Sequence, residues 1–186
     1  MAYVNLVEQP RGVIPRLAAL YGRRRFGRAV EPVQAASHHR GVLVAAGLME
    51  TAAGRAWRKL PPDLAHLAMR AAAVAVGCSW CVDYGSYEGL QMGETPSKVR
   101  DVPVWRTSDA YSAVERAVLE FAEAASATPA TVDEDLVHRL RDHFTEAQVV
   151  ELAAWVALEN YRSRFNAGLG LHSQGFCDAS RVTATP

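Results

Sequence analysis

The sequence predicts an all-α fold, and three observations support this prediction. Apolar residues recur at intervals of three and four along most of the chain, helix-start signals precede several of these runs, and no segment alternates convincingly as a strand would. With 186 residues, 49% hydrophobic and 22% charged, the chain is long enough for one domain with a sizeable core. We therefore expect a single-domain bundle of six to eight helices over residues 1–186.

The N-terminal third is expected to contain an arm followed by helices. Residues 1–12 read as an extended arm, a short helix fits Pro15 to about Arg24, and Glu31 opens another helical region. A longer helix then spans about residues 37–57, where several glycines permit close packing against a neighbour. Its expected buried face consists of Val42, Ala45, Ala46, Met49 and Ala53.

The central third contains the clearest apolar stripe. Two prolines and Asp63 are a helix-start signal. The residues at helical spacing behind it are Leu64, Leu67, Ala68, Ala71, Val74 and Ala75. Gly77 is expected to interrupt this helix, so that Cys78 stands near the start of a new one with free backbone N–H groups. Gly93 ends that helix, and Thr95 caps a short one.

The C-terminal third is expected to hold three more helices after a connecting loop at residues 101–107. The first begins at Ser108 or Asp109 and ends near Ala125. Its buried face consists of Val114, Ala117, Val118, Phe121 and Ala122.

The last two helices are marked by their N-terminal caps. Thr131 or Asp133 caps a helix that runs through Leu140. Thr145 and Gln148 form a capping box for a long helix that ends near residue 168, and the tail after Gly170 reads as irregular.

Two of the three cysteines, Cys78 and Cys81, stand three residues apart in the motif Cys-Ser-Trp-Cys. Cysteines at this spacing lie on one face of a helix, close enough for their sulfurs to bond, and a helix start favours the thiolate. The pair is therefore a candidate for cycling between dithiol and disulfide. Two other interpretations stay open: cysteines that only pack in the core, and half of a zinc site completed by His172 and Cys177.

Composition excludes several classes of partner. Lys and Arg total 20, as do Asp and Glu, so no overall basic charge is available to hold nucleic acid or an anionic membrane. The N-terminus lacks the features of a signal peptide, and no apolar run approaches the ~18 residues of a membrane span. Three cysteines, an odd number, favour a reducing compartment, and we expect a cytoplasmic protein.

Four segments carry a resemblance to a known family. They are Leu60–Leu64 with the Ala-rich helix behind it, Gly77–Asp83, Glu115–Ala122 and Asn160–Asn166. Together they resemble the carboxymuconolactone decarboxylase-like superfamily, and more closely its alkylhydroperoxidase-D-like branch, over about residues 31–172. The resemblance implies a helical bundle that associates through its helices into a trimer or a dimer of trimers.

The resemblance also implies a thiol-dependent oxidoreductase, either a peroxidase or a disulfide reductase. Cys81 would attack the peroxide or disulfide, and Cys78 would donate a proton and resolve the product to a disulfide. An external dithiol or a protein would then reduce the pair. No cofactor or metal is expected, because the sequence has no flavin or nicotinamide fingerprint.

This chain departs from the proton relay of that family at two positions. The family has Glu twelve residues before the motif and His four residues after it, whereas this chain has His66 and Gly85 there. Gly85 is expected to leave a gap beside the sulfur, which Gly85→His would fill with benefit. His66 is then the best remaining base, with Tyr84 and Glu88 as weaker candidates, and we expect a slow or substrate-restricted peroxidase.

Two other functions stay open. A carboxymuconolactone decarboxylase-like lyase would have no evident use for the cysteine motif. A non-catalytic oligomeric module would have cysteines that merely pack, and their thiols would react slowly at neutral pH.

Overall fold

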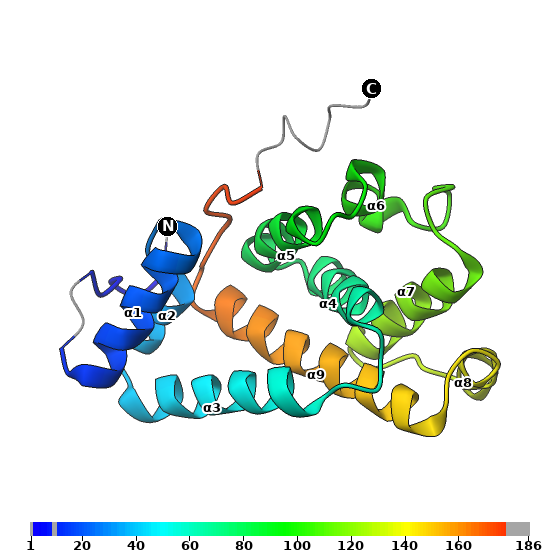
Figure 1. Cartoon of the computed structure of the whole chain (residues 1–186), viewed down its shortest axis with the longest axis horizontal. Coiled ribbons are helices and arrows are strands. Elements are labelled where there is room, and N and C mark those ends of the chain that lie inside the picture. Colours follow the sequence, from blue (N-terminus) through cyan, green and yellow to red (C-terminus); the bar gives the residue numbers. More distant parts are fainter. Residues whose placement is uncertain (1, 9–10, 178–186) are drawn as a thin grey trace. The chain divides into compact units, whose positions relative to one another are not determined.

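The computed structural model describes residues 2–8 and 11–177, whose regular secondary structure is helical, with no strand among them (Figure 1). Its helices are α1 (Val13–Phe26), α2 (Glu31–Ala36), α3 (Arg40–Ala56), α4 (Pro62–Val76), α5 (Ser79–Gln91), α6 (Pro96–Arg100), η1 (Val102–Val104), α7 (Ala113–Ser126), α8 (Glu134–Arg141) and α9 (Glu146–Gly168). The predicted all-α class is confirmed. The expected six to eight helices were too few, since the described residues hold nine α-helices, two of them only five or six residues long.

The chain divides into two compact units. The first contains the described residues up to Trp57 together with Gly168–His172, and the second contains Arg58–Ala167 and the described residues from Ser173 onward. One domain over residues 1–186 therefore stays a prediction. None of the helices in the described ranges is long and apolar enough to cross a membrane.

The first unit consists of α1, α2, α3 and the N-terminal arm. The arm is held by backbone contacts: Tyr3 N donates to Leu169 O at 2.8 Å, and Gln34 Nε2 donates to Val7 O at 3.3 Å. The face predicted for α3 is right at Ala53, which is fully buried, but wrong at Met49, which is 51% exposed, and it omitted Leu43, which is buried at 8%. The spacing of apolar residues predicted the helix correctly, but it did not identify all of the residues on its buried face.

The second unit is built around α4, which packs against α7 on one side and α5 on another (Figure 1). Small side chains on α4 permit this close packing, since Ala68 and Ala72 are fully buried. The start of α4 is fixed from α9, where the buried Glu151 carboxylate accepts hydrogen bonds from Lys59 N (2.7 Å) and Leu60 N (3.1 Å). The core also contains Val118, Leu119, Phe121, Leu136, Leu140, Leu152 and Val156.

Most predicted caps of the second unit are confirmed. Thr95 and Asp133 accept hydrogen bonds at the starts of α6 and α8, and Thr145 N donates to Gln148 Oε1 at 2.9 Å before α9. The exception is α7, which begins after Ser112 rather than at Ser108 or Asp109. Ser108 Oγ instead donates to Asp101 Oδ2 at 2.8 Å, which keeps that segment in a turn.

Candidate active site

The cysteine pair lies at the junction between α4 and α5. Gly77 ends α4 with a φ of 79°, a conformation that favours glycine, and Cys78 is the N-cap of α5. The Cys78 sulfur accepts a hydrogen bond from Cys81 N at 3.2 Å. Cys78 and Cys81 are joined in the predicted disulfide, with their Cα atoms 5.3 Å apart.

Both sulfur-bearing residues are buried. Cys78 is 2% exposed and Cys81 is 6% exposed, so Cys81 is the more accessible of the two. They lie at the N-terminal end of α5, where the helix dipole and free N–H groups favour negative charge. The position can therefore stabilise a thiolate once the disulfide is reduced.

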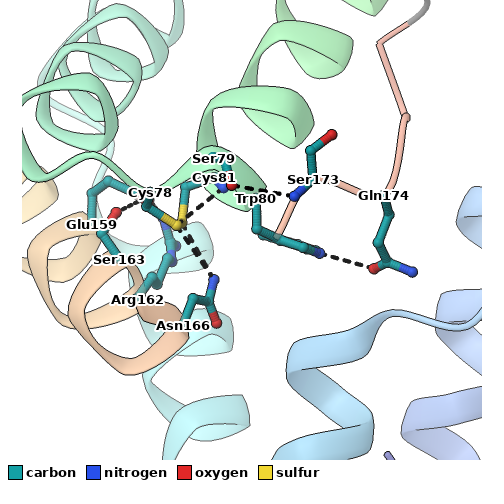
Figure 2. Close-up of a disulfide and its surroundings, with 10 residues drawn as sticks. All are labelled: Cys78, Ser79, Trp80, Cys81, Glu159, Arg162, Ser163, Asn166, Ser173 and Gln174. Atoms are coloured by element: carbon teal, nitrogen blue, oxygen red, sulfur yellow. Dashed lines mark hydrogen bonds and ion pairs between the residues drawn. A yellow bond between two sulfur atoms is a disulfide. The ribbon is translucent and has the colours of Figure 1, made fainter. Parts of the chain in front are cut away.

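A polar stripe on α9, consisting of Glu159, Ser163 and Asn166, reaches this pair through Asn166. All three side chains are buried, and Ser163 Oγ donates to Glu159 Oε1 at 2.9 Å. Asn166 points its amide at the disulfide (Figure 2), with Nδ2 3.3 Å from Cys81 Sγ and 3.9 Å from Cys78 Sγ. The polar side chain that reaches the sulfurs therefore comes from α9.

Arg162 links the polar stripe to α4. Its Nη1 lies 3.0 Å from Glu159 Oε2 and 3.1 Å from Met69 Sδ. Its charge also acts on His66, whose pKa it helps to lower.

The three predicted relay residues, His66, Tyr84 and Glu88, form a group between α4 and α5. His66 Nδ1 lies 4.0 Å from Glu88 Oε2, and Tyr84 Oη donates to Glu88 Oε1 at 2.7 Å. Burial lowers the pKa of His66 below its ordinary value of 6.5, opposed by Glu88 and assisted by Arg70 and Arg162. The imidazole is thus neutral at pH 7 and able to accept a proton.

The expected gap at Gly85 does not exist, because Arg70 of α4 fills it. A Cβ added at Gly85 would lie 2.9 Å from Arg70 Cγ, and one added at Gly89 would meet the guanidinium itself. Arg70 is 3% exposed and forms an ion pair with Glu94. The prediction that Gly85→His would help is therefore wrong, since the imidazole would have no space.

Asp83, two residues beyond the motif, holds a C-terminal segment against α5. We call residues 173–177 the strap. The Asp83 carboxylate accepts hydrogen bonds from Ser173 Oγ (2.8 Å), Phe176 N (3.0 Å) and Cys177 N (2.8 Å). Two further bonds join the strap to the first turn of α5, from Trp80 Nε1 to Gln174 Oε1 at 2.8 Å and from Ser173 N to Ser79 Oγ at 3.3 Å (Figure 2).

Aromatic rings extend this attachment along α5. Trp80 stacks on Tyr84 with ring centroids 5.2 Å apart, and Phe176 of the strap meets both rings edge-on at 5.8 Å. Tyr87 lies 6.3 Å from the same Phe176 ring. These contacts cover Trp80, which is buried, while Tyr84, Tyr87 and Phe176 stay half-buried.

The zinc interpretation needs a set of ligands. Within residues 2–8 and 11–177, no group of three or more His, Cys, Asp and Glu side chains is placed to hold a metal ion. Cys177 is in no disulfide there, and the other two cysteines are joined to each other.

Sequence reasoning missed Asn166, Arg70 and Asp83. A signal existed for Asn166, because positions 159, 163 and 166 are polar at the four- and three-residue intervals of one helical face. For Arg70 there was none, since arginine on a helix usually lies at the surface. The contacts of Asp83 come from residues 90 and more positions away in sequence.

The sequence of this chain is similar to a protein family and to a bacterial relative. Residues 43–124 match the model of the carboxymuconolactone decarboxylase family. The chain is 32% identical to the uncharacterized protein YnjA of Escherichia coli K12 over 165 residues. The aligned residues cover 89% of this chain and 91% of YnjA.

Two solved structures show the same fold at lower identity. The debrominase Bmp8, as a cysteine-to-alanine variant in complex with 2,3,4-tribromopyrrole, has a TM-score of 0.80 at 23% identity, with 95% of each chain covered. The alkylhydroperoxidase AhpD core of an uncharacterized peroxidase-related protein from Ralstonia eutropha JMP134 has a TM-score of 0.79 at 19% identity, with 93% of this chain and 95% of that one covered.

Proposed function

Because the chain belongs to the carboxymuconolactone decarboxylase family, we propose that it is a thiol-dependent oxidoreductase, a peroxidase or disulfide reductase, that uses Cys78 and Cys81. The observation that carries the proposal is the cysteine pair itself. The two residues are joined at the N-terminal end of a helix, and each sulfur has a hydrogen-bond donor. Such a pair can open and close with little movement of the backbone.

Cys81 is the proposed attacking residue and Cys78 the resolving one. With a hydroperoxide, the Cys81 thiolate attacks the terminal oxygen, the O–O bond breaks, and the alkoxide leaves as an alcohol after taking up a proton. The Cys78 thiol then attacks the resulting sulfenic acid, forming the S–S bond and releasing water. The greater exposure of Cys81, 6% against 2% for Cys78, supports this order.

An external dithiol completes the cycle. Its first thiolate attacks the Cys78–Cys81 disulfide to give a mixed disulfide, and its second thiol releases the two cysteines as thiols while the donor becomes a disulfide. With a small disulfide as substrate, the same exchange runs with Cys81 as the attacking group. A peroxide or a disulfide is thus the proposed substrate, and a dithiol or protein the proposed reductant.

His66 is proposed to accept the proton of the Cys81 thiol. Its lowered pKa leaves the imidazole neutral, and the carboxylate of Glu88, itself bonded to Tyr84, stabilises the imidazolium that forms. The chain has His66 and Gly85 at the two relay positions where the family has Glu and His. We expect a slow enzyme for that reason.

The test is peroxide consumption with a dithiol reductant, measured for the wild type, Cys81→Ser, Cys78→Ser and Cys177→Ser. We expect Cys81→Ser to lose turnover, Cys78→Ser to accumulate a trappable sulfenic acid, and Cys177→Ser to retain the wild-type rate. His66→Gln should lower the rate by ~10²-fold or more, as loss of a general base does. A small disulfide and 2,3,4-tribromopyrrole, the ligand of the debrominase, complete the substrate panel.

The lyase and the non-catalytic module give different results in the same assay. A lyase acting on a carboxymuconolactone would keep its rate in the Cys78→Ser, Cys81→Ser double variant, which would overturn the thiol mechanism. Two slow thiols and no turnover with any of these substrates would support the packing module instead.

A further inference from the structure

Asn166 is a buried amide whose bonding is poor in the disulfide form. It is 2% exposed, and its Nδ2 is directed at Cys81 Sγ (3.3 Å) and, at a longer distance, Cys78 Sγ (3.9 Å). Sulfur is a weak acceptor when it carries no charge. Because burying an amide without a good partner costs free energy, the disulfide state leaves this donor under-compensated.

Reduction changes the acceptor. A thiolate at Cys81 is an anion, and a hydrogen bond to a charged acceptor is roughly twice as strong as one between neutral groups. The amide is also enclosed, since Asn166 is 2% exposed in the last turn of α9 and follows the fully buried Ser163 on the same helical face. The donor is therefore positioned for the state in which Cys81 is charged.

The two sulfurs differ in their donors. Cys78 Sγ accepts the backbone N–H of Cys81, a bond that any residue at 81 except proline would supply. The Asn166 side chain, 85 positions beyond Cys81 in the chain, makes its shorter bond to Cys81 Sγ (3.3 Å) and only a longer one to Cys78 Sγ (3.9 Å). A side chain can thus make one sulfur of the pair reactive and leave the other as its partner.

We propose that Asn166 is a catalytic residue that stabilises the Cys81 thiolate and thereby selects Cys81 as the attacking cysteine. This inference rests on the proposed thiol function and names the group that activates it. The same hydrogen bond would shift the redox equilibrium of the cysteine pair. A side chain that stabilises the thiolate favours the reduced pair and makes the disulfide a stronger oxidant.

The test uses the full chain with Cys177→Ser as background, so that the motif holds its only thiols. Asn166→Asp keeps the shape but removes the donor, and Asn166→Leu removes all polarity. Asn160→Leu is the matched control on the same helix, because that amide donates to Ser126 Oγ (2.8 Å) and Val156 O (3.0 Å). The rate of alkylation by iodoacetamide is measured against pH after reduction, and the modified cysteine is identified by peptide mass mapping.

We expect the midpoint of the Cys81 alkylation profile to rise by about one to two pH units in Asn166→Leu, the value of a hydrogen bond to a charged group. Asn166→Asp should raise it further, because its carboxylate repels the thiolate. In equilibrium with glutathione, the Asn166→Leu disulfide should be about tenfold harder to reduce, which corresponds to a potential about 30 mV more negative. Asn160→Leu should match the background in both measurements.

Profiles of the Asn166 variants that coincide with that of Asn160→Leu would overturn the inference, even if Cys81-dependent peroxide turnover stands. Alkylation that falls on Cys78 in the background protein would also overturn it. A fast, Asn166-dependent Cys81 in a protein that turns over none of the substrates would support the inference while the proposed function fails.

Discussion

Arg70 occupies the space that Gly85 and Gly89 leave open on α5, and so determines what position 85 can hold. Its guanidinium is buried and paired with Glu94 on one side only: within the described chain, Arg70 Nε, Arg70 Nη1 and Glu94 Oε1 have no hydrogen-bond partner. A buried ion pair of this kind is costly to disturb, because a charge left without its partner stays desolvated. The two glycines are therefore required by Arg70.

Gly85→His is expected to destabilise the protein and to reduce its activity. The new Cβ would lie 2.9 Å from Arg70 Cγ, and Arg70 cannot withdraw without breaking its pair with Glu94. Overpacking of a core costs about 1–3 kcal/mol, and a broken buried pair costs more. Chemical denaturation would measure the loss.

The matched control for this change is Gly47→Ala on α3, where an added Cβ meets nothing within 4 Å. That variant should gain up to about 1 kcal/mol from helix propensity. A Gly85→His protein as stable as the wild type would contradict the assignment of Arg70 to this space.

His66 should make the stability of the protein depend on pH below neutrality. Its pKa in the folded state is lowered, mainly by burial, so the unfolded chain takes up the proton first as the pH falls below 6.5. The unfolded state then binds more protons, and the free energy of unfolding decreases with falling pH. Denaturation at several pH values should show a shallower slope for His66→Gln than for the wild type.

The control for this slope is His138→Gln, which removes an exposed histidine of α8. Equal slopes for the His66 variant and the wild type would mean that the imidazole titrates alike in both states, contrary to its burial between α4 and α5.

Among the elements around the cysteine helix, the strap is attached to α5 by side-chain hydrogen bonds and by ring contacts. A single carboxylate, Asp83, accepts three of its hydrogen bonds, and Phe176 packs on the aromatic rings of α5. The strap itself contains no helix, so these contacts and the bonds to Trp80 and Ser79 hold it in place.

Asp83→Ala is expected to release the strap. Hydrogen bonds to a charged group contribute about 1.5–3 kcal/mol each, so loss of this acceptor should favour the detached state by tenfold or more. The readout is the alkylation rate of Cys177, which is half-buried in the strap and should react faster once released. Gln174→Ala removes the acceptor of the Trp80 bond but leaves the Asp83 carboxylate in place, so it should give a smaller increase. Equal rates in all three proteins would show that Asp83 does not hold the segment.

Elements defined by interactions between residues close in sequence were predicted well, and those that depend on distant residues were not. Helices whose start depends on a local cap, such as α8 at Asp133 and α9 at Thr145, were predicted to within a residue or two. The start of α7 was predicted too early because Ser108 bonds Asp101 instead of capping a helix. The Cys78–Cys81 disulfide was predictable from the spacing of the two cysteines. Asn166 and the strap were not, because they contact the motif from more than 80 residues away in the sequence.

For the whole molecule, the first unit leaves apolar side chains of α1 in solvent. Val13, Leu17 and Tyr21 are 72%, 59% and 66% exposed, and they recur every four residues on one stripe. A contiguous exposed apolar surface marks an interaction site. We propose that a second copy of this chain covers this surface, in the trimer or dimer of trimers expected from the family resemblance.

Leu17→Glu is therefore expected to weaken self-association. Light scattering at micromolar concentration should give an oligomer for the wild type and a smaller species for the variant. Val150→Glu on α9 replaces another exposed apolar residue, 69% exposed, that lies outside this stripe, and should leave the oligomer intact. A monomeric wild type, or equal masses for all three proteins, would contradict association through α1.

Trp80 lies between the two cysteines in the chain, and its indole stacks on Tyr84 beside the strap. A neighbouring disulfide accepts an electron from an excited indole and suppresses its emission, whereas a dithiol does so much less. We therefore expect an optical indicator in the protein: the emission of Trp80, one of four tryptophans in the chain, should rise when the pair is reduced and fall when it is oxidised. Both half-reactions can then be followed continuously in an unlabelled chain, whichever oxidant and reductant the molecule uses.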